Sequence, residues 1–215
     1  MLALLSLWWS TAALCSAQGQ TTNPPPALRA RVVVLGDSIT AGAGLDQQKA
    51  YPAVLQEKVD AAHLPFEIVN AGVSGDTTAG GLRRVDWVLA KGAGVLIVAL
   101  GGNDGLRGIQ ATQTEENLRQ IVERARKKIP DLPVIIAGME MPASMGADYV
   151  AEYRKVFTKV AAETNATLIP FLLEGVGGIP ELNQADMIHP TAAGQKIVAE
   201  NVWKALQPVL SKAEK

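Results

Sequence analysis

The sequence contains little cysteine, few aromatic residues and no excess of charge of either sign. One cysteine occurs in 215 residues, aromatic residues make up 5%, and the formal net charge is −1 at pH 7. Without a basic excess, nothing favours binding to nucleic acid or to an anionic membrane. The chain has only two histidines and lacks both the His-Glu-x-x-His spacing of catalytic zinc sites and the Gly-x-x-x-x-Gly-Lys-Ser/Thr of phosphate-binding loops. We therefore expect no metal and no nucleotide cofactor.

The N-terminal segment differs from the rest of the chain. Residues 1–17 carry no charge, contain an apolar stretch shorter than the roughly 20 residues of a membrane helix, and end in Cys15-Ser16-Ala17. These features predict a secretory signal peptide, no stable membrane span, and a periplasmic or secreted protein. Cleavage after Ala17 would remove the one cysteine, so the mature chain could form no disulfide. Residues 18–29 are predicted to be a Pro-rich lead-in to a single domain at 30–215, for which we favour a monomer.

Apolar segments alternate with segments of helical periodicity along this domain. Because strand and helix alternate, the sequence predicts a three-layer α/β/α sandwich with a flavodoxin-like, five-stranded parallel sheet in the order 2-1-3-4-5. The clearest helix is Glu115–Ile129, and Thr112 followed by Glu115 resembles a capping box at its start. The predicted strands are Val32–Leu35, Phe66–Asn70, Val95–Leu100, Val134–Gly138 and Thr167–Phe171.

A serine stands directly after the first predicted strand, in Gly36-Asp37-Ser38. Ser38 could simply cap the following helix, or it could be a nucleophile held at the carboxyl edge of the sheet, where sites of such folds form. A nucleophile needs a base, and His189 in a loop near the last helix is the better of the two histidines, since His63 is expected at a helix end. Asp186, three residues earlier, could orient the His189 ring. Because only a neutral imidazole accepts a proton, we expect activity to rise through about pH 6–8.

Oxyanion donors are also available in the segments that follow the strands. The backbone N–H groups of Ser38 and Gly75 and the side-chain amide of Asn103 could stabilise a tetrahedral intermediate. Taken singly, Gly75 could be a turn glycine and Asn103 a turn or cap residue. Their combination with a nucleophile, a base and an orienting carboxylate at one edge favours catalysis.

Four blocks carry a family resemblance, and they occur in the family's order. "GDSIT", "GVSGDT", "GGND" and "DMIHP" resemble the SGNH (GDSL) hydrolase superfamily, and "LGGNDGLRG" is similar to its thioesterase I, lysophospholipase L1 and arylesterase group. The resemblance implies Ser38 as nucleophile, Gly75 and Asn103 as oxyanion donors, and Asp186 with His189 as the rest of a triad. It also implies esterase or thioesterase activity with no cofactor.

The expected substrate is a small-molecule acyl ester or thioester. Met139, Met141 and Met145 follow the fourth predicted strand, and their adaptable side chains could form the wall of an acyl pocket or merely pack the loop. The scarcity of tryptophan offers no stacking platform for sugars, which favours aliphatic or aryl esters, thioesters and lysophospholipids. Two alternatives stay open: a carbohydrate O-acetyl esterase, and a non-catalytic small-ligand-binding protein on the same fold.

Overall fold

The structure, a computed structural model, describes residues 29–213 and contains one five-stranded parallel sheet. Its strand order is β2-β1-β3-β4-β5, so the predicted fold class and order are confirmed. The predicted strand limits agree with the observed ones to within two residues. The strands are β1 (Ala30–Gly36), β2 (Phe66–Gly72), β3 (Val95–Ala99), β4 (Val134–Ala137) and β5 (Thr167–Ile169).

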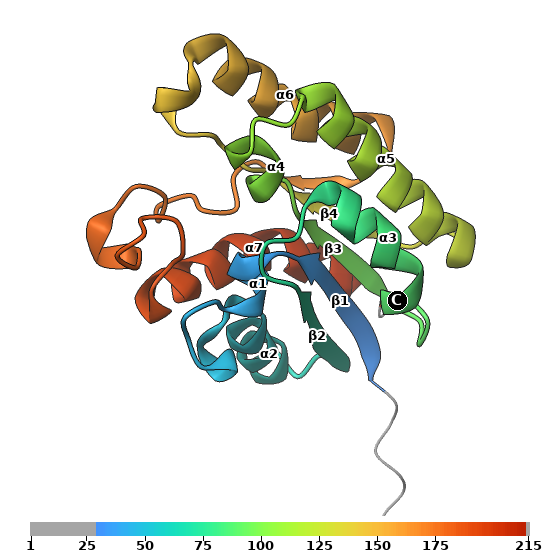
Figure 1. Ribbon diagram of the computed structural model, residues 1–215. Coiled ribbons are helices and arrows are strands. Elements are labelled where there is room, and N and C mark those ends of the chain that lie inside the picture. Colours follow the sequence, from blue (N-terminus) through green and yellow to red (C-terminus); the bar gives the residue numbers. More distant parts are fainter. Residues whose placement is uncertain (1–28, 214–215) are drawn as a thin grey trace, which may run out of the picture.

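Helices cover both faces of the sheet (Figure 1). Helices α2 and α7 pack against each other on one face, and α3, α5 and α6 lie side by side on the other. The α-helices are α1 (Ser38–Ala41), α2 (Tyr51–Ala61), α3 (Thr78–Val88), α4 (Gly102–Leu106), α5 (Ala111–Lys128), α6 (Ala147–Glu163) and α7 (Ala192–Ala213). Three short 3-10 helices lie at Gln47–Lys49, Ala143–Met145 and Pro180–Leu182.

Strand β1 lies between β2 and β3 and positions the candidate site. Its residues Val32 to Leu35 are fully buried, as expected for a β-branched strand that is covered on both faces. Gly36, its last residue, pairs with Gly72 of β2 and with Ala99 of β3. The carboxyl ends of β1, β2 and β3 therefore lie at one edge of the sheet, and the segments that come after them meet there.

One local prediction is wrong. The predicted capping box of Thr112 and Glu115 does not form, because α5 begins at Ala111, so that Thr112 already lies inside the helix. Gln110 occupies the N-cap position, and its side chain makes no capping hydrogen bond. Ala111 and Thr114 are buried, so tertiary packing rather than a local cap fixes the first turn of this helix. The glycine-rich segment after β3 contains α4, and Gly101 precedes this helix with a φ of +116°.

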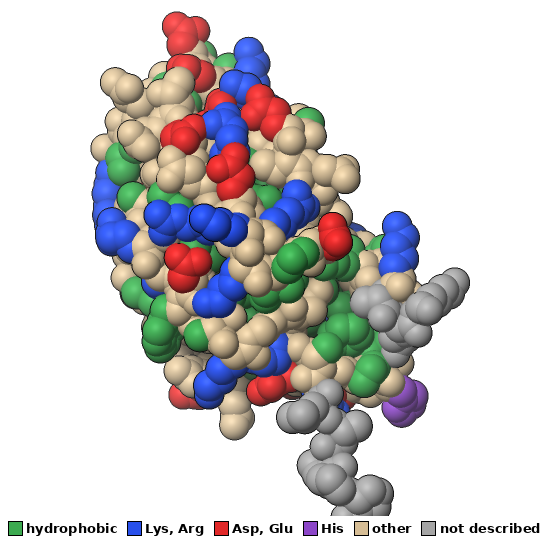
Figure 2. Space-filling model, turned by 90° about the vertical axis from the view of Figure 1, so that its right-hand side faces the viewer, with side chains coloured by type: hydrophobic (Ala, Val, Ile, Leu, Met, Phe, Trp, Pro, Cys, Tyr) green, Lys and Arg blue, Asp and Glu red, His purple; other side chains and the backbone are tan. Residues whose placement is uncertain are grey.

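The predicted signal peptide and nearly all of the predicted Pro-rich lead-in lie outside the described residues. Between residues 29 and 213, no helix is both long and apolar enough to cross a membrane. The face in Figure 2 carries intermixed acidic and basic side chains with hydrophobic ones between them, in keeping with a formal net charge of −1.

Candidate active site

In the turn after β1, one residue caps the following helix and the next residue carries the candidate nucleophile. Asp37, not Ser38, is the N-cap of α1, because its Oδ1 accepts a hydrogen bond from the Ile39 N–H at 3.0 Å. Ser38 is the first helical residue, and its hydroxyl does not cap the helix. The cap interpretation of Ser38 is therefore wrong.

Ser38, His189 and Asp186 form one chain of hydrogen bonds. His189 Nε2 lies 2.8 Å from Ser38 Oγ, and His189 Nδ1 lies 2.6 Å from Asp186 Oδ2. The other carboxylate oxygen of Asp186 accepts the backbone N–H groups of Ile188 and His189 at 2.9 and 3.0 Å. This compact turn holds the carboxylate against the ring, with Met187 between them in the left-handed region at φ +58°. The other histidine, His63, is exposed beyond the end of α2.

The pKa values of two carboxyl groups, those of Asp186 and Asp37, are shifted in opposite directions from their ordinary value. The hydrogen bond from the His189 ring, aided by the two backbone N–H groups, holds the pKa of Asp186 far below its usual value. Burial raises the pKa of Asp37 from 3.8 to about 6, although the Ile39 N–H and the nearby His189 partly oppose this. Asp186 is thus ionised throughout the neutral range, as a carboxylate that stabilises an imidazolium must be.

The three predicted oxyanion donors come after β1, β2 and β3. Gly75 has a φ of +78°, a conformation that side chains rarely adopt, and a Cβ there would lie 3.7 Å from the Arg107 guanidinium. Within residues 29–213, the N–H groups of Ser38 and Gly75 donate to no protein acceptor. The Asn103 Nδ2 donates to the Asp76 carbonyl at 2.9 Å, which uses one of the two N–H groups of the amide, and Asn103 lines the cavity described below.

A cavity of about 570 Å³ opens beside these groups, within the size range of small-molecule sites. Ser38, Asn103 and His189 line it together with Met139 and Met141. Met145 is not among the lining residues; it is partly buried against the core, so we withdraw it as a wall residue. The rest of the lining is largely apolar and includes residues that the sequence did not indicate: Leu106, Phe171, Leu173, Met187 and Ile188.

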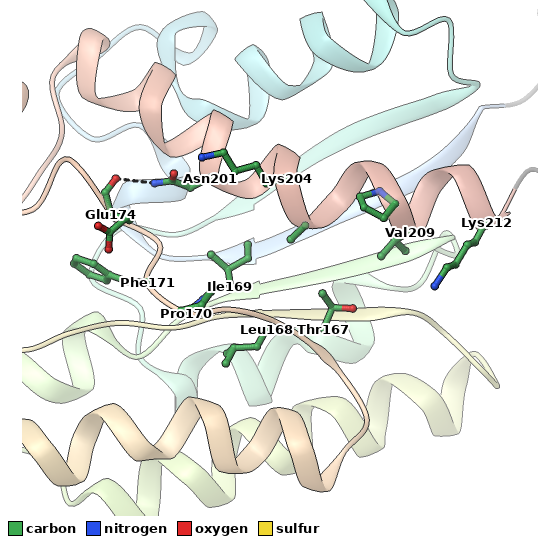
Figure 3. A pocket seen from close by; sticks show the side chains of 12 residues that line it. Thr167, Leu168, Ile169, Pro170, Phe171, Glu174, Asn201, Lys204, Val209 and Lys212 are labelled. Carbon is green, nitrogen blue, oxygen red and sulfur yellow. Dashed lines mark hydrogen bonds between the residues drawn. The ribbon is translucent and has the colours of Figure 1, made fainter.

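A second hollow, of about 710 Å³, lies between β5 and α7 (Figure 3). Ile169, Ala205 and Val209 form apolar parts of it, and Lys204 and Lys212 are among its polar lining. None of the predicted site residues lines this hollow. This second hollow thus contains none of the candidate reacting groups, although Phe171 lines both cavities.

Sequence reasoning missed the buried groups that connect the donor segments. Asp104, fully buried beside Asn103, accepts hydrogen bonds from the N–H and the hydroxyl of Thr78, the first residue of α3. Asn117 of α5 donates to the same hydroxyl at 3.0 Å. A carboxylate in the small-residue segment after β3 was the one available signal, but its partners lie far away in the sequence. Among the residues that the structure describes, no three His, Cys, Asp or Glu side chains gather where they could hold a metal ion.

Comparison with known proteins agrees with this geometry. Residues 34–197 match the GDSL-like Lipase/Acylhydrolase family. The chain belongs to this family. The predicted SGNH (GDSL) resemblance is confirmed, and the family places this acylhydrolase among the serine enzymes that hydrolyse esters.

Relatives of this acylhydrolase match over most of its length. The chain is 42% identical to the esterase TesA of Pseudomonas aeruginosa, over 83% of this chain and 89% of that protein. It is 36% identical to thioesterase 1/protease 1/lysophospholipase L1 of Escherichia coli K12, over 84% of this chain and 85% of that protein. A crystal structure of TesA superposes with a TM-score of 0.80 at 40% identity, covering 83% of this chain and 99% of that one.

Proposed function

We propose that the protein hydrolyses acyl esters and thioesters through a Ser38-His189-Asp186 triad and an acyl-serine intermediate. The single observation that carries this proposal is the contact of 2.8 Å between His189 Nε2 and Ser38 Oγ, made by residues 151 positions apart. Nucleophile and base at hydrogen-bond distance, with the base oriented by a carboxylate, is the geometric signature of an activated serine.

In acylation, His189 Nε2 takes the Ser38 proton as Oγ attacks the carbonyl carbon. The carbonyl oxygen becomes an oxyanion, which accepts hydrogen bonds from the Ser38 and Gly75 N–H groups and from the Asn103 amide. As the intermediate collapses, the bond to the alcohol or thiol breaks, and His189 returns the proton to that leaving group. Asp186, held ionised by its hydrogen bonds, stabilises the imidazolium in between.

Deacylation repeats these steps with water. His189 takes a proton from water as the water oxygen attacks the carbonyl carbon of the acyl-serine. When the second tetrahedral intermediate collapses, the bond between Ser38 Oγ and the acyl group breaks, the acid is released, and His189 returns the proton to Oγ. No step in either half requires a group beyond these side chains and backbone amides.

The proposed substrates carry an aliphatic or aryl acyl group. The cavity walls are mainly apolar, and Met139 and Met141 can rearrange around chains of different length. The names of the relatives point to the same range: esterase for one, and thioesterase and lysophospholipase for the other. A periplasmic or secreted monomer that acts on small acyl substrates is the setting we propose.

Hydrolysis of nitrophenyl esters from acetyl to palmitoyl by the wild type and by Ser38→Ala tests the proposal. We expect kcat to fall at least ~10⁴-fold in Ser38→Ala and in His189→Ala, and by less in Asp186→Ala, where the backbone still partly holds the ring. Near-normal turnover by Ser38→Ala would contradict the triad. An optimum confined to acetyl esters would instead favour an O-acetyl esterase, and absence of both turnover and phosphonate labelling would favour a binding protein.

A further inference from the structure

Arg84 is not part of the proposed triad, but its side chain contacts the segments that carry two of the proposed oxyanion donors, Ser38 and Gly75. It belongs to the second turn of α3, and its side chain leans toward the helix N-terminus, as side chains on helices do. There its guanidinium contacts three acceptors: the Asp76 Oδ2 at 2.7 Å, the Ala71 carbonyl at 2.7 Å and the Gly36 carbonyl at 2.8 Å. The ion pair is largely enclosed, with side-chain exposures of 18% for Arg84 and 12% for Asp76.

Each acceptor of Arg84 is close in the chain to an oxyanion donor. Gly36 is two residues before Ser38, and its carbonyl also accepts the Val73 N–H at 3.0 Å, two residues before Gly75. Asp76 directly follows Gly75, and its backbone carbonyl holds the Asn103 amide at 2.9 Å. Arg84 thus directly connects the segments after β1 and β2, and the segment after β3 is joined to them through the hydrogen bond from Asn103 to the Asp76 carbonyl.

The absence of a side chain at Gly80 leaves space for the Asp76 carboxylate that pairs with Arg84. A Cβ at Gly80 would lie only 1.6 Å from Asp76 Oδ1, so a side chain at position 80 would displace the carboxylate. Gly80 has helical backbone and no positive φ, so its local conformation does not require glycine. Room for the Asp76 carboxylate does require it.

We propose that Arg84 and Asp76 form a positioning pair that fixes the Gly75 and Asn103 donors relative to Ser38. The inference rests on the proposed serine mechanism and adds to it the side chains that hold its oxyanion site. A guanidinium suits this task because its rigid fork directs several N–H groups at once, whereas a lysine ammonium is a compact point charge.

The expected effect lies in the transition state rather than in substrate binding. Donors that move by a few tenths of an ångström still admit the neutral ester, but they stabilise the oxyanion less. Deleting a donor outright costs ~10²–10³-fold in kcat, so displacing two of them is expected to cost about 10- to 100-fold. KM should change by less than about 3-fold.

Arg84→Met is to be compared with Arg126→Met, which is a matched control. Arg126 also joins backbone carbonyls through its guanidinium, those of Leu132, Thr164 and Asn165, but these precede β4 and β5 at the opposite edge of the sheet. Both variants lose packing and hydrogen bonds to backbone carbonyls, and Arg84→Met also loses the ion pair with Asp76. We expect a loss of thermal stability in both, and a lowered kcat in Arg84→Met alone.

The second readout is the affinity for a boronic acid, which forms a tetrahedral adduct on serine, against that for an ether analogue of the ester, which cannot react. In Arg84→Met the boronic acid should bind about 10- to 100-fold more weakly, in step with kcat, and the ether should bind as in the wild type. Arg84→Lys should remain at least about 5-fold below the wild type in kcat. Equal kcat in Arg84→Met and Arg126→Met, equal weakening of both ligands, or full activity of Arg84→Lys would overturn the proposal.

Asp76→Asn keeps the inference testable if Arg84→Met does not fold. The amide has the same shape but removes the ion pair, so it should lower kcat and boronic-acid affinity in the same way. The double variant Asp76→Asn/Arg84→Lys should lose less transition-state stabilisation than the sum of the two single variants, because both substitutions disrupt the same contact between Arg84 and Asp76. Wild type and Ser38→Ala run in the same assay decide the serine mechanism separately: an inactive wild type refutes the mechanism, whereas an active wild type with unaffected Asp76→Asn refutes only the positioning pair.

Discussion

At the scale of single residues, two neighbours in the turn after β1 have different roles. Asp37 satisfies the first turn of α1 with its carboxylate, and Ser38 keeps its hydroxyl for His189. This arrangement buries an acidic group, which is 3% exposed, at the edge of the reaction site. Burial disfavours its charged form, and the pKa of Asp37 rises to about 6 as a result.

The raised pKa of Asp37 predicts a pH-dependent cost in stability. Its folded pKa lies above the unfolded value, so between about pH 4 and 6 the folded state holds a proton that the unfolded state loses, and stability falls as pH rises through this window. Asp37→Asn keeps a capping oxygen but cannot ionise. Relative to the wild type, we expect the free energy of unfolding of Asp37→Asn to increase by about 2 kcal/mol from pH 4 to pH 7. Urea titrations across this range measure the difference, and a difference that stays constant with pH would contradict the assignment.

At the scale of elements, α5 is held by its buried face rather than by its ends. Its N-cap makes no side-chain hydrogen bond, while Leu118, Ile121 and Val122 lie almost fully inside the core. Apolar residues at helical spacing predicted this helix, because one face of a surface helix must be buried.

Ile121→Ala is therefore expected to destabilise the protein by about 2–5 kcal/mol, the usual cost of removing a large aliphatic side chain from a packed core. Glu123→Ala, on the exposed face of the same helix, is the control and should change stability by less than about 0.5 kcal/mol. Urea unfolding followed by circular dichroism measures both. Equal effects of the two substitutions would mean that the packing of α5 contributes little.

At the scale of the whole molecule, segments distant in the chain depend on one another. The first described strand, β1, lies between β2 and β3, and α7, the last helix, packs on α2. Removing β1 would expose the buried sides of β2 and β3, and removing α7 would expose the buried face of α2. The described domain should therefore unfold as one cooperative unit.

Far-UV circular dichroism and residual activity followed through a urea titration test this cooperativity. The two curves should share one midpoint, because the hydrogen bond between Ser38 and His189 joins the first residue of α1 to the loop before α7. The midpoint should also move to higher urea when Ser38 is occupied by a boronic acid, since only the folded state binds it. An early loss of activity with the helical signal intact would indicate that the site opens before the sheet does.

The sequence by itself determined the layers of the fold and indicated the groups that we propose to react. Alternation of buried strands with amphipathic helices arises from local periodicity, and parallel strands place the residues beyond their carboxyl ends at one edge. Ser38 after the first strand, and His189 as the better placed of two histidines, could therefore be predicted before any contact was seen. Asp186, three residues before His189, and the donors Gly75 and Asn103 after the next two strands were predicted in the same way. The resemblance of four ordered blocks implied the same residues.

Only the tertiary structure decided how these groups are held. The start of α5 depends on what its first turn packs against, Met145 packs on the core instead of lining the cavity, and Asp37 rather than Ser38 closes the turn. Arg84 reaches acceptors 8, 13 and 48 residues away, and no local pattern marks such contacts. Periodicity reports which face of an element is buried, whereas hydrogen bonds between distant segments exist only once the elements have packed, so the support of the site could be found only in the fold.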